Sequence, residues 1–239
     1  MVTLMPGSER LTDSELVLDR DKLTLREVNK ALRALPPGGR ARVVNPRGRH
    51  NLAVGLDAEV AVDIDGATGY YVGGLGKHAT VTVHGRAGWG VGENLMSGSV
   101  HVLGDAGQSV ASSAHGGTVV VEGDCSLRTA ISLKGATVVV SGDVGAYCAF
   151  MAQAGTVLVG GNTGPALGDS LYEAVIYVAG RVKSLGTDAR IEELRAEDVA
   201  LVRALVAAHS LDHVDPENVT RVASARELYH FDTHHAGAY

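Results

Sequence analysis

This sequence of 239 residues has few aromatic residues, two cysteines and no excess of basic residues. Aromatic side chains make up 4% of it, too few to predict a surface that stacks bases or sugars. The formal net charge of −6 argues against nucleic acid as the main partner. No apolar run reaches the ~18 residues of a membrane span. The first residues, Met1 to Ser8, lack a signal-peptide pattern, so we expect a cytoplasmic protein.

The two cysteines, Cys125 and Cys148, are too few for an iron–sulfur cluster, which usually takes four. A disulfide is not expected in a cytoplasmic protein, so both should be buried small apolar residues. A histidine group near the C-terminus (His230, His234, His235) lacks zinc-type spacing. Local spacing also contains no Ser-His-Asp or Cys-His motif. We therefore predict no catalytic, cofactor-binding or metal-binding residue on this chain.

The sequence does contain a strict repeat of glycine. Seven glycines stand nineteen residues apart: Gly66, Gly85, Gly104, Gly123, Gly142, Gly161 and Gly180. A fixed period without insertion indicates one structural unit stacked on copies of itself. A second glycine recurs three positions further on, at Gly69, Gly88, Gly107, Gly145 and Gly164, with Ser126 in the remaining place. Thirteen positions after the repeat glycine, only alanine or glycine occurs in the first six units.

Each unit also contains a pair of apolar residues two positions apart, such as Val119 and Val121, which is strand periodicity. A β-branched strand, a glycine turn and a return every nineteen residues predict an all-β fold, a right-handed parallel β-helix with 19-residue coils. We place it at 41–187. Stepping back nineteen residues from Val62 and Ile64 gives Val43 and Asn45, so an irregular first coil is expected there.

Short α-helical arms are expected on both sides of the β-helix. The N-terminal arm, 1–40, contains a predicted capping helix that starts at a capping box, Thr24 and Glu27, and stops before Pro36. The C-terminal arm, 188–239, should contain a helix over roughly 188–209 and then a docking tail. Six residues form the apolar face of that helix: Ile191, Leu194, Val199, Val202, Leu205 and Val206.

The tail is rich in aromatic and basic residues, so we expect it to dock on its own solenoid or on another subunit. Its candidate docking residues are Arg226, Leu228, Tyr229 and Phe231. Removal of 221–239 should then leave the solenoid folded and abolish partner binding.

Two further motifs have competing interpretations. A column of acidic and amide residues follows the repeat glycines, at Asp105, Asp124, Asp143 and Asn162. Turn chemistry explains it, and a bound cation is the alternative. A basic patch near the first coil comprises Arg40, Arg42, Arg47, Arg49 and His50. It is interpreted as a solvated capping face, or else as a surface for an acidic partner. The glycines around Trp89 belong to the repeat and not to a nucleotide loop, because no helix pattern follows them.

Two coils carry a resemblance to a known family. The coil from Gly66 to Val83, with Gly69-Tyr70-Tyr71-Val72-Gly73-Gly74, and the coil from Gly104 to Val121 resemble the GXGXG domain of the glutamate synthase large subunit. The resemblance covers about 25–187 and implies the same right-handed β-helix. The segment 224–231, together with the end in Ala238-Tyr239, resembles stand-alone versions of the domain. These are subunits of glutamate-synthase-like complexes such as N-methylglutamate synthase.

The resemblance implies a non-catalytic scaffold in a hetero-oligomer. A class II glutamine-amidotransferase-like subunit and an FMN-binding glutamate-synthase-like subunit would be the partners. The complex would transfer nitrogen between glutamate or glutamine and methylamine or a 2-oxo acid. FMN, and in some such complexes an iron–sulfur cluster, would lie on a partner subunit. Val2 follows Met1, so this chain has no N-terminal cysteine nucleophile.

Three alternatives share part of the pattern. The C subunit of formylmethanofuran dehydrogenase and its formyltransferase/hydrolase relative resemble the same β-helix. A stand-alone β-helix enzyme acting on carbohydrate should show insertions that form a cleft, and the period here has none across six coils. A hexapeptide acyltransferase needs a six-residue period, of which nineteen is not a multiple.

Overall fold

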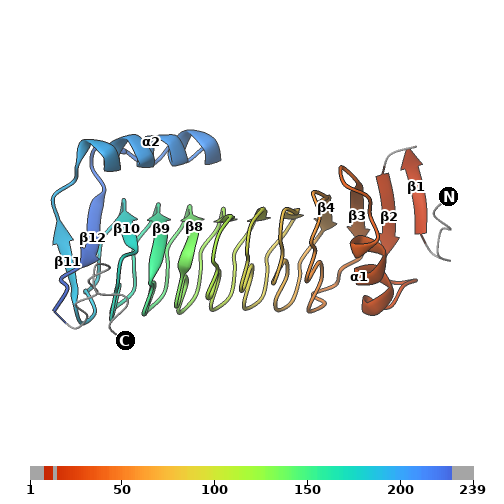
Figure 1. Cartoon of the computed structure of the whole chain (residues 1–239), viewed down its shortest axis with the longest axis horizontal. Helices are drawn as coiled ribbons and strands as arrows, with labels where there is room; N and C mark the ends of the chain where they lie inside the picture. The colour runs from red at the N-terminus through yellow and green to blue at the C-terminus, as the bar shows by residue number, and fades with distance from the viewer. Residues whose placement is uncertain (1–7, 13–14, 228–239) are drawn as a thin grey trace, which may run out of the picture.

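A computed structural model gives the fold and describes residues 8–12 and 15–227. One sheet of twelve strands runs the length of the molecule in the order β1-β2-β3-β4-β5-β6-β7-β8-β9-β10-β12-β11. Figure 1 shows its central strands as a row of stacked coils. These strands are β3 (Arg40–Val44), β4 (Ala61–Asp65), β5 (Thr80–Val83), β6 (Ser99–Val102), β7 (Thr118–Val121), β8 (Lys134–Val140), β9 (Ala154–Val159) and β10 (Val175–Val178).

The predicted parallel β-helix with 19-residue coils is confirmed. From β4 to β10, each strand pairs in parallel with the next, and residues nineteen apart face each other, as Val81 and Val100 do. The two predicted apolar columns point inward, and their members are at most 2% exposed. The bore of the solenoid is therefore a packed core. Its handedness stays a prediction.

The N-terminal end differs from the expected irregular coil. Strand β1 (Ser8–Thr12) forms a hairpin with β2 (Glu15–Asp19), and β2 pairs in parallel with β3. The parallel sheet therefore extends beyond the predicted start near residue 41. Strand β3 is also out of the nineteen-residue register, because Ala41 pairs with Val62 and Val43 with Ile64.

Two one-residue insertions explain this register. The Gly48 N–H donates to the Ala67 carbonyl, nineteen residues on, whereas the equivalent bond of the next coil, from Thr68 to Arg86, spans eighteen, so one extra residue lies in the turn that contains Asn45 and Pro46. Asp57 pairs with Lys77, twenty residues on, and Ala61 with Thr80, nineteen residues on, so the other extra residue lies between Asp57 and Ala61. Asn45 consequently lies in a left-handed turn, with φ 55°, and not in the inward column.

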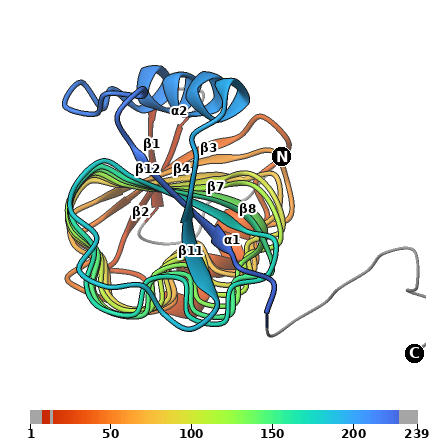
Figure 2. The ribbon, with the colours of Figure 1, turned by 90° about the vertical axis from the view of Figure 1, so that its left-hand side faces the viewer.

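Helix α1 (Leu25–Arg33) is the predicted capping helix, and both hydrogen bonds of the Thr24–Glu27 capping box are present. Its Val28 and Leu32 join the main core. The Asn29 side chain donates to the Asn51 carbonyl (2.7 Å) and accepts from the Ala53 N–H (2.9 Å), which fastens the helix to the first coil. Viewed along the stack in Figure 2, α1 lies within the outline of the coils.

At the C-terminal end the chain folds back on the solenoid. Strand β11 (Ala189–Glu192) leads to helix α2 (Ala196–His209), and β12 (Thr220–Ser224) then inserts antiparallel between β10 and β11. The helix is shorter than the expected 188–209, and Ile191 lies in a strand with 61% of its surface exposed. Val222 of β12 is fully buried. For 220–224, the tail's docking site is therefore its own solenoid.

Helix α2 covers the outer face of the sheet and not its bore (Figure 1). In each strand, the residue between the two inward residues points outward. In β7 to β10 this outward column is apolar: Val120, Val139, Leu158 and Tyr177. These side chains form a second hydrophobic cluster with Val202 of α2 and with Leu211, Val214 and Val219 of the following loop. Within the described ranges, no helix is long and apolar enough to cross a membrane.

The return leg of each coil is built largely from left-handed residues. Tyr71, Gly73 and Leu75 have φ of 63°, 68° and 56°, and Tyr147 has 59° at the position equivalent to Tyr71. A left-handed conformation costs an L-residue roughly 1–2 kcal/mol. The register of the stacked coils imposes this conformation on whatever residue occupies these columns.

Candidate functional site

The repeat glycines are sites of close contact between coils. Only Gly66 of the seven has a positive φ, at 129°. A Cβ on Gly123 would lie 2.2 Å from Asp105 Oδ1, and one on Gly180 would lie 2.4 Å from the Gly161 carbonyl oxygen. Glycine is required here because the preceding coil leaves no room for a side chain.

The acidic column is explained by turn hydrogen bonds. Asp105 Oδ1 accepts the Asp124 N–H at 3.0 Å, and Asp124 Oδ1 accepts the Asp143 N–H at 2.8 Å. Asp143 and Asn162 continue the same ladder. In the part of the chain that the structure describes, no group of three or more His, Cys, Asp or Glu residues could hold a metal ion. His230, His234 and His235 lie outside that part.

Cys125 and Cys148 are both free and buried. Burial raises the pKa of the Cys148 thiol to about 12 and also raises the pKa of Cys125. Both thiols therefore stay protonated at neutral pH, which makes them poor nucleophiles.

Much of the basic patch near the first coil is paired within the chain. Arg42 contacts Asp65 (3.0 Å) and Glu15 (3.6 Å). Arg47 contacts Asp21 at 2.5 Å. These contacts leave less positive charge for an acidic partner than the sequence alone suggests.

The candidate docking residue Arg226 lies at the opposite end of the solenoid, where it pairs with Glu173 at 3.2 Å. Leu228, Tyr229 and Phe231 lie outside the described residues. Arg226 lines a cavity of about 220 Å³, the candidate functional site, between β10, β11 and β12. Three further arginines line it: Arg190, Arg195 and Arg221.

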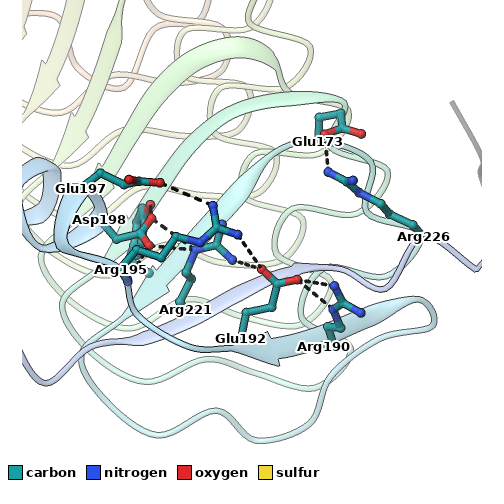
Figure 3. Close-up of polar contacts among 9 residues, drawn as sticks. Glu173, Arg190, Glu192, Arg195, Glu197, Asp198, Arg221 and Arg226 are labelled. Carbon is teal, nitrogen blue, oxygen red and sulfur yellow. Dashed lines mark hydrogen bonds and ion pairs between the residues drawn. The ribbon is translucent and has the colours of Figure 1, made fainter. Parts of the chain in front are cut away.

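A network of ion pairs forms the wall of this cavity (Figure 3). Arg221 of β12 is 7% exposed, and its guanidinium contacts Glu192 of β11 and Asp198 of α2. Asp198 also accepts from the Tyr177 hydroxyl of β10 at 2.5 Å and from the Arg195 N–H at 2.9 Å. Arg190 donates to Glu192 as well. The network thus joins β10, β11, β12 and α2.

Burial and ion pairing shift the pKa values of Asp198 and Arg221 in opposite directions. Burial would raise the pKa of Asp198, but hydrogen bonds from Tyr177, the Arg195 N–H and Arg221 outweigh it, and the pKa is lowered. Burial would lower the pKa of Arg221, but Asp198 and Glu192 raise it. Burial and the neighbouring Asp198 both raise the pKa of Tyr177. At neutral pH the carboxylate, the guanidinium and the neutral phenol are all favoured.

These pairings give the cavity wall a structural role. We call Glu192, Asp198 and Arg221 the clasp, because their ion pairs hold β11, α2 and β12 together. The arginines of the cavity wall pair with carboxylates, and the Ser224 hydroxyl donates to Asp188. Among the residues that the structure describes, the lining therefore contains no unpaired base or nucleophile. Sequence reasoning missed Glu192, Asp198 and Arg221, which stand up to 29 residues apart along the chain. The one local signal was an arginine inside the apolar run around Val222, whose charge requires a buried partner.

Comparison with known proteins relates this chain to a curated protein. No known protein-family profile matches it. Among curated proteins, it is similar to protein GlxC of Rhizobium meliloti (strain 1021). The two sequences are 50% identical over 226 residues, which cover 93% of this chain and 99% of GlxC. The similarity therefore includes the solenoid and at least part of both arms.

Proposed function

The chain belongs to the family of protein GlxC, and we propose that this family is glutamate-synthase-like and that the chain is a non-catalytic β-helix subunit of a glutamate-synthase-like complex. It would hold catalytic partner subunits at a fixed separation. The specific assignment that we propose is N-methylglutamate synthase in the cytoplasm, on the resemblance of the tail to stand-alone GXGXG subunits.

The observation that supports a scaffold is the packed bore. The inward columns run without a break from β4 to β10, with no member more than 2% exposed. A core of close-packed valines has no room for substrate. The described thiols are buried with raised pKa values. The chain therefore offers rigidity and surface to the complex, which is what a spacer requires.

The chemistry would belong to the partners. We propose a class II glutamine-amidotransferase-like subunit that supplies the nucleophile, and an FMN-binding glutamate-synthase-like subunit that carries the flavin. Nitrogen would pass between glutamate or glutamine and methylamine or a 2-oxo acid on those subunits.

Co-expression with an amidotransferase-like subunit and an FMN-binding glutamate-synthase-like subunit from the same organism tests the proposal. We expect a stable complex with flavin absorbance and synthase activity. The chain purified alone should show neither glutaminase activity nor flavin absorbance. Glutaminase activity of the isolated chain, or its failure to join the complex, would contradict the scaffold role.

A further inference from the structure

One side of the solenoid carries an exposed aromatic surface that sequence reasoning did not identify. We call Tyr70, Tyr71, Trp89, Leu127 and Tyr147 the aromatic stripe. Their exposed fractions lie between 37% and 48%. All five lie four or five residues after a repeat glycine, so they occupy two neighbouring columns. The Tyr71 N–H donates to the Trp89 carbonyl at 2.7 Å, and similar bonds keep the later coils aligned. The stripe therefore lies on one face of the solenoid, with the polar Gln108 and Ser109 of the intervening coil between Trp89 and Leu127.

The rings at its N-terminal end are stacked in fixed positions. Tyr70 stacks on His50, with ring centres 4.3 Å apart, and on Trp89, with ring centres 4.9 Å apart and planes at 12°. The Tyr70 N–H donates to His50 Nδ1 at 2.8 Å, and this hydrogen bond fixes the His50 ring at the N-terminal end of the stack. Side chains that are already ordered lose little entropy when a partner binds.

The second glycine column makes room for these rings. A Cβ on Gly88 would lie 2.7 Å from Tyr70 Cδ1, and one on Gly107 would lie 2.5 Å from Trp89 Cδ1. The column is interrupted at Ser126, where the corresponding residue of the preceding coil is Gln108 and not an aromatic. Glycine therefore occurs in this column at Gly88 and Gly107, where an aromatic ring of the preceding coil occupies the space that a Cβ would need.

The charges on this surface indicate what kind of partner fits it. Arg49 precedes His50, and Arg128 lies in the same column as Tyr71 and Tyr147. Both arginines are exposed, and no carboxylate pairs with them in the part of the chain described. Glu93 lies near the stripe, because a Cβ on Gly90 would be 2.9 Å from Glu93 Oε2. That carboxylate and the net charge of −6 disfavour a nucleic acid.

We propose that the aromatic stripe is the docking surface for a partner subunit that presents apolar side chains flanked by carboxylates, which pair with Arg49 and Arg128. Exposed contiguous apolar surface, such as the rings of Tyr70, Tyr71 and Trp89 form, typically marks a protein interaction site. Aromatic and arginine anchors dominate such interfaces. Four coil steps of about 4.8 Å separate Tyr70 from Tyr147, so the stripe is about 19 Å long. The proposal rests on the proposed function, because the partners come from the same complex.

The test compares variants of the chain co-expressed with the amidotransferase-like and FMN-binding subunits. We expect Trp89→Ser and Arg128→Glu each to reduce, at least tenfold, the amount of one of these two subunits that co-purifies with the chain. Arg128→Glu leaves the stacked rings intact, so it keeps the test open if Trp89→Ser fails to fold. The matched controls are Ile191→Ser and Leu201→Ser, which replace exposed apolar residues on β11 and α2. They should retain the partner within twofold.

The possible results separate this inference from the proposed function. If the wild-type chain joins the complex and both stripe variants join equally well, the inference is wrong and the scaffold role stands. If the wild-type chain joins neither subunit, the scaffold role fails and the inference with it.

Two other occupants are tested on the isolated chain. Trp89 is its single tryptophan, so acrylamide quenching reports on the stripe alone. Truncation after Glu227 should leave this quenching unchanged. A twofold increase would mean that the chain's own tail covers the stripe, which would overturn the proposal. Self-association of the wild type that Trp89→Ser abolishes would overturn it too, in favour of a second copy.

Discussion

At the scale of single residues, glycine has three distinct roles in this chain. Gly123 lies against the side chain of the preceding coil, where a Cβ would be 2.2 Å from Asp105 Oδ1. Gly88 leaves space for the ring of Tyr70. Gly98, at the small-residue position before β6, has a positive φ of 84°. The same residue type is therefore needed for close contact, for ring packing and for backbone conformation.

The close-contact role predicts that Gly123→Val destabilises the fold, because a side-chain rotation of Asp105 alone cannot remove the clash. The new side chain would meet both Asp105 Oδ1 and the Asp105 backbone nitrogen, 2.2 Å and 2.8 Å from its Cβ. Overpacking of this kind costs about 1–3 kcal/mol. Urea denaturation measures the loss. Thr82→Val, on the outward column, is the control and should change stability by less than about 0.5 kcal/mol. A Gly123→Val chain as stable as the wild type would show that the coils can separate freely.

The clasp at the C-terminal end predicts a pH-dependent contribution to stability. The pKa of Asp198 is lowered from its ordinary value of 3.8. The ionised carboxylate is therefore favoured in the folded state. Its contribution is complete above the ordinary pKa and is lost as the pH falls through the lowered value.

We therefore expect Asp198→Asn to cost about 1.5–3 kcal/mol at pH 7, because it removes one of the two carboxylates that pair with the buried Arg221. The difference from wild type should shrink below about pH 4, where Asp198 of the unfolded chain takes up a proton before Asp198 of the folded chain does. Urea denaturation of both chains between pH 3 and 8 measures it. A difference that stayed constant across this range would contradict the assigned role of the charge.

At the scale of elements, each strand of the later coils has two buried faces. Val138 of β8 is in the bore and Val139 is under α2, and both are 0% exposed. The outward column carries Asp63, Thr82 and His101 in the earlier coils and becomes apolar from Val120 onward. The change of this column from polar to apolar marks where the helix begins to cover the sheet.

This arrangement predicts different outcomes for two adjacent substitutions. Val139→Asp should release α2 while the solenoid stays folded, because the charge disrupts only the outer cluster. Val138→Asp should unfold the central coils, because it places an unpaired charge in the bore. Hydrogen–deuterium exchange distinguishes the two, with faster exchange confined to α2 and its flanking loop in the first case. Equal exchange throughout both variants would show that the two clusters are one cooperative unit.

The sequence could predict the elements that repeat and not those that interrupt the repeat. Strands β4 to β10 and helix α1 follow from the nineteen-residue columns and from the Thr24–Glu27 capping box. Strands β2, β11 and β12 pair with residues outside that period. The insertion of β12 depends on Arg221 meeting Glu192, 29 residues away. Ile191 was assigned to a helix because one apolar residue fits either periodicity. The aromatic stripe was missed because its residues are few in number, although they gather in two columns.

At the scale of the whole molecule, both ends of the parallel stack are closed by an antiparallel element. The β1–β2 hairpin closes one end, and β12 covers β10 at the other. A solenoid needs such terminal caps because an open coil exposes its core and a row of unpaired backbone groups. The C-terminal cap also connects α2 to the sheet through Arg221 and Asp198.

Two truncations therefore have different expected outcomes. A chain that ends at Glu227 keeps β12 and the clasp, so it should keep the oligomeric state of the full chain and melt within a few degrees of it. A chain that ends at Val219 loses Val222, which is fully buried, and opens the edge of β10. It should melt at a lower temperature and aggregate. Size-exclusion chromatography and thermal melting measure both.

The position of β12 in the sheet revises the expectation that 221–239 can be removed without loss of the fold. Because β12 is part of the sheet, a partner-binding defect after that deletion would report unfolding of the cap as well as loss of contacts. Only the truncation after Glu227 isolates Leu228, Tyr229 and Phe231 as docking residues. If a chain ending at Val219 kept the oligomeric state and the melting temperature of the full chain, β12 would be dispensable, and the clasp would have no part in closing the solenoid.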